Sequence, residues 1–282
     1  MTDYPLTFKC NNNCITCISK TSEISKISDP RIQDIKNAIE KINPRTDYLG
    51  LGGGEPTLRK EFFEILKYAR KTNPNIYIFL TTNGRIFSYK EFAKKLSKLS
   101  LKNFRVGVAL YGHNEKIHER ITRCRGSFGQ TVKGIKNLIE FGFHVEIRVI
   151  ISRLNYKSLP HIAKFAAEKF PGMERFVFVN MKYTGNALKN RKKVLVKISK
   201  VVPLTERAVK ILKENNVNTK LYHFPLCILP ENLRNMAKGV TKEAGELTFV
   251  KVCEKCRLRE DCPRIWKSYV KLVGDKEFGF VG

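Results

Sequence analysis

The chain has 282 residues, of which 42% are hydrophobic, and this is enough for one large or two modest globular domains. No apolar run approaches the ~20 residues that a membrane-spanning helix needs, and the opening stretch MTDYPLTFKC lacks the pattern of a secretory signal. The 53 lysines and arginines exceed the 26 aspartates and glutamates, and the formal net charge is therefore +27. These features predict a cytoplasmic protein without a membrane segment.

The basic residues are spread along most of the chain, as in KNRKKVLVKISK and KSLPHIAKFAAEKF. No arginine-rich tail and no familiar nucleic-acid-binding module is recognisable. A generally basic, solvated surface is the simplest interpretation of the charge. RNA as a substrate or partner is the alternative, because a strongly positive surface attracts phosphate groups.

From residue 1 to about residue 180, short β-rich apolar runs alternate with amphipathic helical patterns. The predicted strands are Tyr4–Lys9, Tyr48–Gly52, Ile76–Thr82, Phe104–Leu110, Val145–Ile151 and Phe176–Asn180. Alternation of this kind predicts an α/β fold with a parallel sheet covered by helices. Six strand–helix units favour a partial (β/α)6 TIM-like barrel over the closed eightfold barrel.

After Asn180 the alternation ends in a basic segment, a helix over PLTERAVKILKENN and a short strand over TKLYHF. The remaining cysteines follow. We therefore expect a barrel over residues 1–200 and a small C-terminal domain over residues 201–282.

Three of the eight cysteines, Cys10, Cys14 and Cys17, lie directly after the first predicted strand. In a reducing cytosol such a group favours metal binding over disulfides, and ligands in parallel α/β folds bind at the carboxyl ends of the strands. Three thiolates suit zinc poorly, because structural zinc takes four ligands. An iron–sulfur cube held by three cysteines would keep one iron open, unlike an electron-transfer cluster with four cysteines.

A glycine-rich stretch, LGLGGGEPTLR, follows the second predicted strand, and its glycines permit close backbone approach. The combination of a Cys-x3-Cys-x2-Cys loop with this GGEP segment resembles the radical S-adenosylmethionine (radical SAM) superfamily. The TTNG stretch at residues 81–84 is also similar to the family pattern. One position departs from it, since Thr16 stands where the family usually has an aromatic residue.

The resemblance implies that Cys10, Cys14 and Cys17 hold a [4Fe-4S] cluster whose open iron is chelated by S-adenosylmethionine. It also implies that a set of residues near the strand ends binds this cofactor. These residues are Gly53, Gly54, Glu55, Pro56, Thr82 and Asn83.

Arg148 lies on the fifth predicted strand, where its charge could pair with the cofactor carboxylate; the alternative is a surface arginine at a strand edge. Asn155, just past that strand, is a further candidate. His113 and His118 could face a substrate or be solvated loop residues. Cys124 is expected to be a small buried thiol, and no catalytic residue is identified.

The second cysteine group consists of Cys253, Cys256 and Cys262, with Cys227 as the candidate fourth ligand. Four cysteines fit zinc or an iron–sulfur cluster equally well, and free thiols are the third possibility. The stretch CEKCRLREDCPR resembles the SPASM and twitch modules of radical SAM maturases, and this implies an auxiliary [4Fe-4S] cluster.

By this resemblance the protein is a radical SAM oxidoreductase that reductively cleaves S-adenosylmethionine to a 5′-deoxyadenosyl radical and abstracts a substrate hydrogen. A looser similarity to His-Xaa-Ser system maturases implies a peptide or protein substrate, with a ferredoxin or flavodoxin as one-electron reductant. Modification of tRNA or of a cofactor precursor is the alternative within the same chemistry. The non-enzyme alternative is an iron–sulfur electron-transfer or binding protein.

Overall fold

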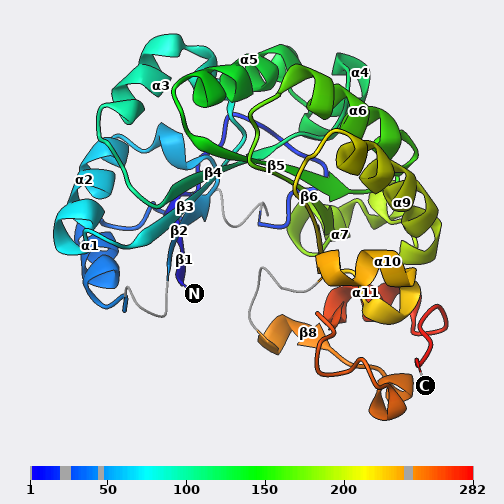
Figure 1. Cartoon of the computed structure of the whole chain (residues 1–282). Coiled ribbons are helices and arrows are strands. Elements are labelled where there is room, and N and C mark those ends of the chain that lie inside the picture. Colours follow the sequence, from blue (N-terminus) through cyan, green and yellow to red (C-terminus); the bar gives the residue numbers. More distant parts are fainter. Residues whose placement is uncertain (1, 20–26, 44–47, 238–243, 282) are drawn as a thin grey trace.

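The structure is a computed structural model that describes residues 2–19, 27–43, 48–237 and 244–281. Seven parallel strands form one curved sheet in chain order, and helices cover its outer side (Figure 1). The strands are β1 (Thr2–Thr7), β2 (Tyr48–Gly53), β3 (Tyr77–Thr82), β4 (Phe104–Ala109), β5 (His144–Ile151), β6 (Arg175–Asn180) and β7 (Thr219–Tyr222). Since β1 and β7 pair only with β2 and β6, the barrel is open between them.

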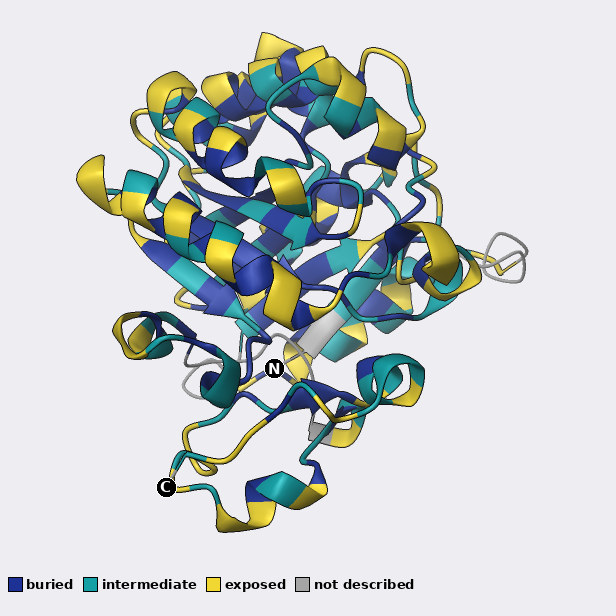
Figure 2. Cartoon of the chain, turned by 90° about the vertical axis from the view of Figure 1, so that its right-hand side faces the viewer, coloured by how far each residue is buried: buried dark blue, intermediate teal, exposed yellow. Residues whose placement is uncertain are grey.

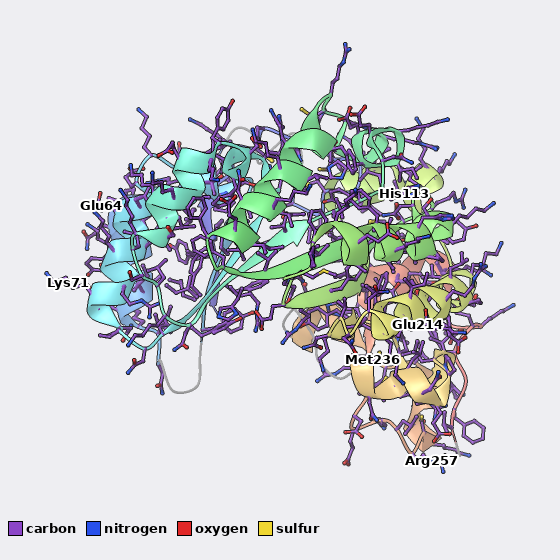
Figure 3. The ribbon with its side chains drawn as sticks, turned by 45° about the horizontal axis from the view of Figure 1, so that its top comes forward. Glu64, Lys71, His113, Glu214, Met236 and Arg257 are labelled. Atoms are coloured by element: carbon purple, nitrogen blue, oxygen red, sulfur yellow. The ribbon has the colours of Figure 1, made fainter. Side chains whose placement is uncertain are left out.

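The helices that cover the sheet come mainly from the crossovers between parallel strands, as such connections require. In chain order the crossover helices are α1 (Ile32–Glu40), α2 (Phe62–Thr72), α3 (Lys90–Ser97), α4 (Glu115–Thr122), α5 (Ser127–Glu140), α6 (Leu159–Lys169), α7 (Gly185–Lys189), α8 (Arg191–Val194) and α9 (Ile198–Glu214). Figure 2 shows that their exposed residues face outward and their buried residues face the sheet. Charged side chains such as Glu64, Lys71 and Glu214 stand on this outer surface (Figure 3).

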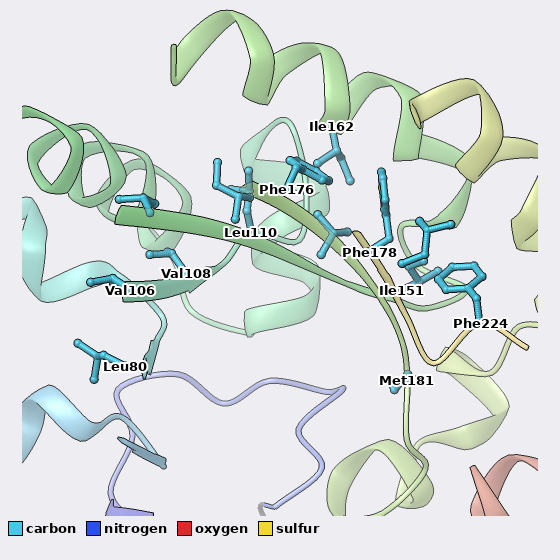
Figure 4. Packing of buried hydrophobic residues seen from close by; sticks show 14 of the residues in the cluster. Leu80, Val106, Val108, Leu110, Ile151, Ile162, Phe176, Phe178, Met181 and Phe224 are labelled. Atoms are coloured by element: carbon cyan, nitrogen blue, oxygen red, sulfur yellow. The ribbon is translucent and has the colours of Figure 1, made fainter. Parts of the chain in front are cut away.

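The hydrophobic core lies between the sheet and the helices. Figure 4 shows Val106, Val108 and Phe176 pointing from their strands toward this layer, together with Ile162 of α6, and all four are fully buried. Side chains alternate between the two faces of a strand, so their neighbours in the sequence point to the concave inner face. The concave face therefore receives the other half of the strand residues.

Arg148 of β5 shows the character of this inner face. Its guanidinium carbon lies 5.4 Å from the ring centre of Phe79 on β3 and 5.7 Å from that of Tyr222 on β7. Neither strand is a neighbour of β5 in the sheet. The three side chains can meet only across the inside of the barrel.

The α/β fold and the partial barrel expected from the sequence are confirmed, with one more strand than the six that define the predicted repeat. β7 pairs with β6 in parallel, from Phe176 opposite Thr219 to Val179 opposite Tyr222, and α9 packs beside α6 as its crossover helix. The sheet thus continues beyond residue 200, where the sequence pattern had placed the end of the barrel.

The C-terminal region follows β7 at the end of the sheet (Figure 1). It contains α10 (Glu231–Arg234), the antiparallel pair β8 (Leu247–Thr248) and β9 (Ile265–Trp266), and α11 (Lys267–Val273). The Trp266 Nε1–H donates to the Asn180 carbonyl oxygen at 3.0 Å, and the Tyr183 N–H donates to Ser268 Oγ at 3.0 Å. These bonds fasten the region to the segment that leaves β6.

Among the described residues, no helix combines the length and the apolar character that crossing a bilayer requires.

Candidate functional site

The loop that carries Cys10, Cys14 and Cys17 follows β1 and is held by the end of α4. The backbone N–H groups on either side of Cys14, those of Asn13 and Ile15, donate to the carbonyl oxygens of Thr122 and Ile121, each at 2.9 Å. Within the loop, the Cys17 N–H donates to the Cys14 carbonyl oxygen at 3.3 Å. The position of Cys14 is therefore set by a helix terminus that lies more than a hundred residues away in the sequence.

A second anchor comes from the segment after β6. The Asn186 Nδ2–H donates to the Cys14 carbonyl oxygen at 3.2 Å, and the Ala187 N–H donates to that of Cys17 at 3.1 Å. Gly185 has a φ of +53°, and a Cβ atom there would lie 3.1 Å from the Cys17 carbonyl oxygen. The backbone of the loop is thus held by hydrogen bonds from two sides.

The three thiols are close enough to influence one another electrostatically. The pKa of the Cys14 thiol is raised to about 12, first by burial and then by the nearby charges of Cys17 and Cys10, while a hydrogen bond with the Tyr111 hydroxyl opposes the rise. Three thiolates at this spot repel one another unless a cation shares them. Because thiolate is the metal-binding form, the electrostatics fit a positively charged metal centre.

The glycine-rich end of β2 packs directly on the segment that leads into the cysteine loop. The N–H groups of Gly54 and Glu55 donate to the carbonyl oxygens of Thr7 and Lys9 at 2.7 and 2.8 Å. A Cβ atom on Gly54 would lie 2.2 Å from the Lys9 carbonyl oxygen, and Gly53 has a φ of +111°. Backbone packing at this turn therefore requires glycine at both positions, whether or not these residues also contact a ligand.

Glu55 is 1% exposed and connects this turn to the end of β3. Its Oε1 accepts hydrogen bonds from the hydroxyls of Thr57 and Thr82 at 2.6 and 2.7 Å, and its Oε2 accepts one from the Asn83 N–H at 2.7 Å. Burial raises the pKa of the carboxyl group although these bonds act in the opposite direction. Both carboxylate oxygens are thus engaged within the protein, and Glu55 orients Thr82 and Asn83.

Asn83 and Arg85 extend the same network to the cysteine loop. The Asn83 Nδ2–H donates to Asn11 Oδ1 at 2.7 Å, and the Arg85 Nη1–H donates to Asn12 Oδ1 at 2.8 Å. The same Arg85 nitrogen lies 3.2 Å from Cys124 Sγ. Sequence reasoning missed Arg85, although its place directly after TTNG was the available signal.

Arg148 is not a strand-edge surface residue, since its side chain is only 13% exposed and lies inside the barrel. Its Nη1 forms an ion pair with Glu146 Oε1 at 3.3 Å, and Arg175 Nη1 lies 3.6 Å from the other carboxylate oxygen. Burial raises the pKa of Glu146, while the arginines oppose the rise. Two arginines share one carboxylate, so the group keeps a net positive charge that suits an anionic ligand group.

The other candidates after β4 and β5 have structural roles. Asn155 is buried, and its Oδ1 accepts a hydrogen bond from the Ser152 N–H at 2.8 Å while its Nδ2–H donates to the Tyr111 carbonyl oxygen at 3.2 Å. His118 is buried in α4, where its Nδ1 accepts a hydrogen bond from the Tyr111 N–H at 3.3 Å. His113 stacks on His161 with ring centres 5.3 Å apart.

The second cysteine group surrounds one cavity of about 340 Å³, which includes space open to solvent. Cys227, Cys253, Cys256 and Cys262 all line it, although 25 residues separate the first from the second. Burial raises the pKa values of the Cys227 and Cys262 thiols, whereas backbone N–H donors lower them. Convergence of four thiols with N–H donors aimed at sulfur fits a thiolate-bound metal centre.

Within the described ranges, no three His, Cys, Asp or Glu side chains are grouped as ligands of a single metal ion. A single zinc ion needs its thiolates about 2.3 Å from one point, whereas the cysteines of an iron–sulfur cube bind different irons. The absence of such a group therefore bears on sites for a single metal ion and not on sites for an iron–sulfur cube.

Comparison with known proteins identifies the family. The profile of the radical SAM superfamily matches residues 4–166, which include the first cysteine loop, the GGEP turn and the TTNG stretch. The chain therefore belongs to the radical SAM superfamily. Membership implies S-adenosylmethionine and a [4Fe-4S] cluster as cofactors.

Several relatives resemble part of the chain. Mycofactocin maturase MftC of Mycolicibacterium smegmatis is 31% identical over 167 residues, which are 58% of this chain and 41% of that protein. Fe-coproporphyrin III synthase of Methanosarcina barkeri is 30% identical over 186 residues, 65% of this chain and 44% of that protein. The matched stretches thus span less than half of either relative.

A solved structure extends the likeness to nearly the whole fold. Native anSMEcpe with bound AdoMet and the Kp18Cys peptide superimposes with a TM-score of 0.66 at 18% identity, covering 97% of this chain and 94% of that chain. The fold likeness therefore includes the C-terminal region as well as the barrel.

The contact between β2 and the cysteine loop predicts that Gly54→Ala is damaging. The added Cβ would meet the Lys9 carbonyl oxygen at 2.2 Å, and relieving such overpacking costs about 1–3 kcal/mol. We expect a lower free energy of unfolding in urea and less iron bound at the first cysteine loop. The matched control is Gly52→Ala, because no heavy atom lies within 4 Å of that position. Equal effects of the two substitutions would contradict the packing role.

His118 predicts a pH dependence of stability. Burial lowers its pKa from 6.5 to about 4, so below pH 6.5 the unfolded chain binds a proton that the folded chain does not. Stability should fall with decreasing pH, by about 1.6 kcal/mol between pH 6.5 and 5. We expect His118→Asn, whose amide oxygen can still accept from the Tyr111 N–H, to reduce this slope in urea unfolding experiments. An unchanged slope would exclude His118 as its source.

Proposed function

We propose that this protein is a radical SAM enzyme that reductively cleaves S-adenosylmethionine and abstracts a hydrogen atom from its substrate. The observation that carries the proposal is the hydrogen-bonded network that joins the three-cysteine loop to the GGEP and TTNG turns at the carboxyl ends of β1–β3. An electron-transfer protein with a fully ligated cluster would need no such connection to a glycine-rich turn. The network therefore favours the enzyme over the non-enzyme alternative.

Cys10, Cys14 and Cys17 would hold the first [4Fe-4S] cluster. This cluster, together with the bound S-adenosylmethionine, supplies the one-electron chemistry that produces a hydrogen-abstracting radical. The chain's own residues orient the cofactor and exclude water and competing hydrogen donors. Abstraction of a hydrogen atom by a radical requires no general base in that step.

The cofactor-binding set proposed here is Gly53, Gly54, Glu55, Pro56, Thr82, Asn83 and Arg148. The contacts within this set support different roles for Glu55 and Arg148. Glu55 acts through Thr82 and Asn83, since its oxygens already accept hydrogen bonds from them. Arg148 supplies positive charge toward the carboxylate of the cofactor from inside the barrel.

The second cysteine group would hold an auxiliary [4Fe-4S] cluster, as in SPASM-type maturases. The shared cavity of Cys227, Cys253, Cys256 and Cys262 supports this assignment. Arg259 and Arg264 flank the cavity, with guanidinium carbons 4.9 and 5.7 Å from the Phe249 ring centre. Their positive charge would offset that of four thiolates.

A peptide or protein is the proposed substrate. One relative is named a maturase, and the structural neighbour was solved with a peptide beside AdoMet. A cofactor precursor is the second candidate, favoured by the similarity to Fe-coproporphyrin III synthase. A ferredoxin or flavodoxin is the proposed electron donor.

The cysteine loop predicts a selective loss of iron. Cys10→Ala, Cys14→Ala and Cys17→Ala combined should remove about half of the iron of the anaerobically reconstituted protein, since each of two cubes holds four irons. The variant should also fail to cleave S-adenosylmethionine when dithionite is supplied as reductant. Chromatography of the reaction products measures this cleavage. Cys124→Ala is the matched control and should retain both, because Cys124 is outside the ligand set. Cleavage by the triple variant would refute the proposed chemistry.

Cys227 predicts the complementary pattern. Cys227→Ala should lower the iron content of the second site, because the substitution removes one of its four proposed thiolate ligands. The other three ligands lie together in the stretch from Cys253 to Cys262. Cleavage of S-adenosylmethionine at the first site should persist. Iron analysis combined with electron paramagnetic resonance distinguishes the two sites. Full iron in this variant would remove Cys227 from the ligand set.

A further inference from the structure

The segment after β6 forms the outer neighbour of the first cysteine loop. The Thr184 hydroxyl donates to the Ile18 carbonyl oxygen at 2.9 Å, and the Ala187 N–H donates to the Cys17 carbonyl oxygen at 3.1 Å. A Cβ atom on Gly185 would lie 2.7 Å from the Ile18 carbonyl oxygen. The start of α7 therefore contacts the proposed cluster ligand Cys17 directly, and α8 follows it in the chain.

This segment is strongly and uniformly basic. No aspartate or glutamate occurs between Glu174 and Glu206. Five exposed basic side chains belong to α7, α8 and the end of α4, and together they are called the basic rim: Arg123, Lys189, Arg191, Lys192 and Lys193. Arg123 joins the others because its Nη2–H donates to Asn190 Oδ1 at 3.3 Å. No described acidic residue forms an ion pair with any of the five, so their charge faces solvent.

Two exposed apolar side chains accompany the basic rim. Ile18 is 36% exposed and Leu188 is 41% exposed. Both are tied to Thr184, since its hydroxyl donates to the Ile18 carbonyl oxygen and its own carbonyl oxygen accepts from the Leu188 N–H at 3.2 Å. A small apolar contact next to unpaired charges is typical of transient protein interfaces, in which complementary charge speeds the encounter.

The basic rim is held in place by the rest of the barrel. Arg153, in the loop after β5, donates through Nε to the Leu195 carbonyl oxygen at 2.9 Å and through Nη1 to that of Lys192 at 3.2 Å. These bonds satisfy carbonyl groups at the end of α8. The surface is therefore preformed rather than assembled on binding.

We propose that the basic rim with Ile18 and Leu188 is the docking surface for an acidic one-electron-donor protein. The inference rests on the proposed function, because the loop beneath this surface matters to a donor only if it holds the first cluster. The donor gives up one electron to that cluster, and no covalent bond forms between the proteins. An acidic donor matches the unpaired charge, and the surface includes Ile18, the residue directly after Cys17.

RNA is the competing occupant of a basic surface. Its binding would depend on phosphate contacts and would gain little from exposed aliphatic side chains such as Ile18 and Leu188. The observations therefore favour a protein donor, and RNA becomes an outcome of the test.

The test uses the reconstituted holoenzyme and an acidic flavodoxin as the probe. The variant Lys189→Glu/Arg191→Glu/Lys192→Glu reverses three charges of the rim. We expect at least a tenfold loss of affinity for oxidised flavodoxin at low salt, measured by fluorescence anisotropy, and a similar loss in the rate of cluster reduction by reduced flavodoxin. The wild-type affinity should fall steeply as salt is added.

The matched control is Lys67→Glu/Lys71→Glu/Lys98→Glu, which makes the same change in net charge. These exposed residues belong to α2 and to the end of α3, across the sheet from α7 in Figure 1, with Lys71 at the outer edge in Figure 3. The control should retain affinity and rate to within about twofold. Equal losses in both triple variants would overturn the proposal, since net charge alone would then explain them.

Two further measurements separate the possible failures. Iron content and dithionite-driven cleavage of S-adenosylmethionine should be unchanged in both triple variants; if wild type fails to cleave, the proposed function fails rather than the docking surface. If the rim variant keeps its flavodoxin affinity but loses affinity for a single-stranded RNA oligonucleotide, the surface binds RNA and the docking proposal is overturned.

Discussion

The backbone contact between the end of β2 and the exit of β1 is the constraint on which the site depends. Two N–H groups from the GGEP turn bind carbonyl oxygens of the segment entering the cysteine loop, and only glycine permits the approach at residue 54. The buried Glu55 carboxylate then carries the constraint to β3 through Thr82 and Asn83. Three strand ends and the first cysteine loop are thereby joined into one hydrogen-bonded unit.

This unit limits which residues can occupy the positions around Glu55. A buried carboxylate is costly unless donors surround it, and the donors that surround Glu55 come from the adjacent turn and from the TTNG stretch. The residues that resemble a cofactor-binding signature therefore also have a structural role that does not depend on a bound ligand. Substitutions at Glu55 would therefore disturb Thr82 and Asn83 first.

The outer and inner faces of the barrel sheet have different roles. The outer face of the strands makes the core under the helices, while the inner face gathers Arg148, Arg175 and Glu146 with aromatic rings around them. Because β1 and β7 do not pair, this inner face is not closed by strand pairing. The C-terminal region stands at the β7 end of the sheet (Figure 1), and its four cysteines line a cavity there.

The sequence by itself determined the strand–helix alternation, the grouping of Cys10, Cys14 and Cys17, and the family likeness, because these are local patterns within short stretches. It could not determine that β7 completes the sheet, since a four-residue strand after a long basic interruption carries too weak a period. Nor could it show that Arg148 faces the barrel interior, that Arg85 reaches the cysteine loop, or that Cys227 shares a cavity with Cys253. Each of these depends on side chains brought together from distant segments, and only the packing of the tertiary structure decides such contacts.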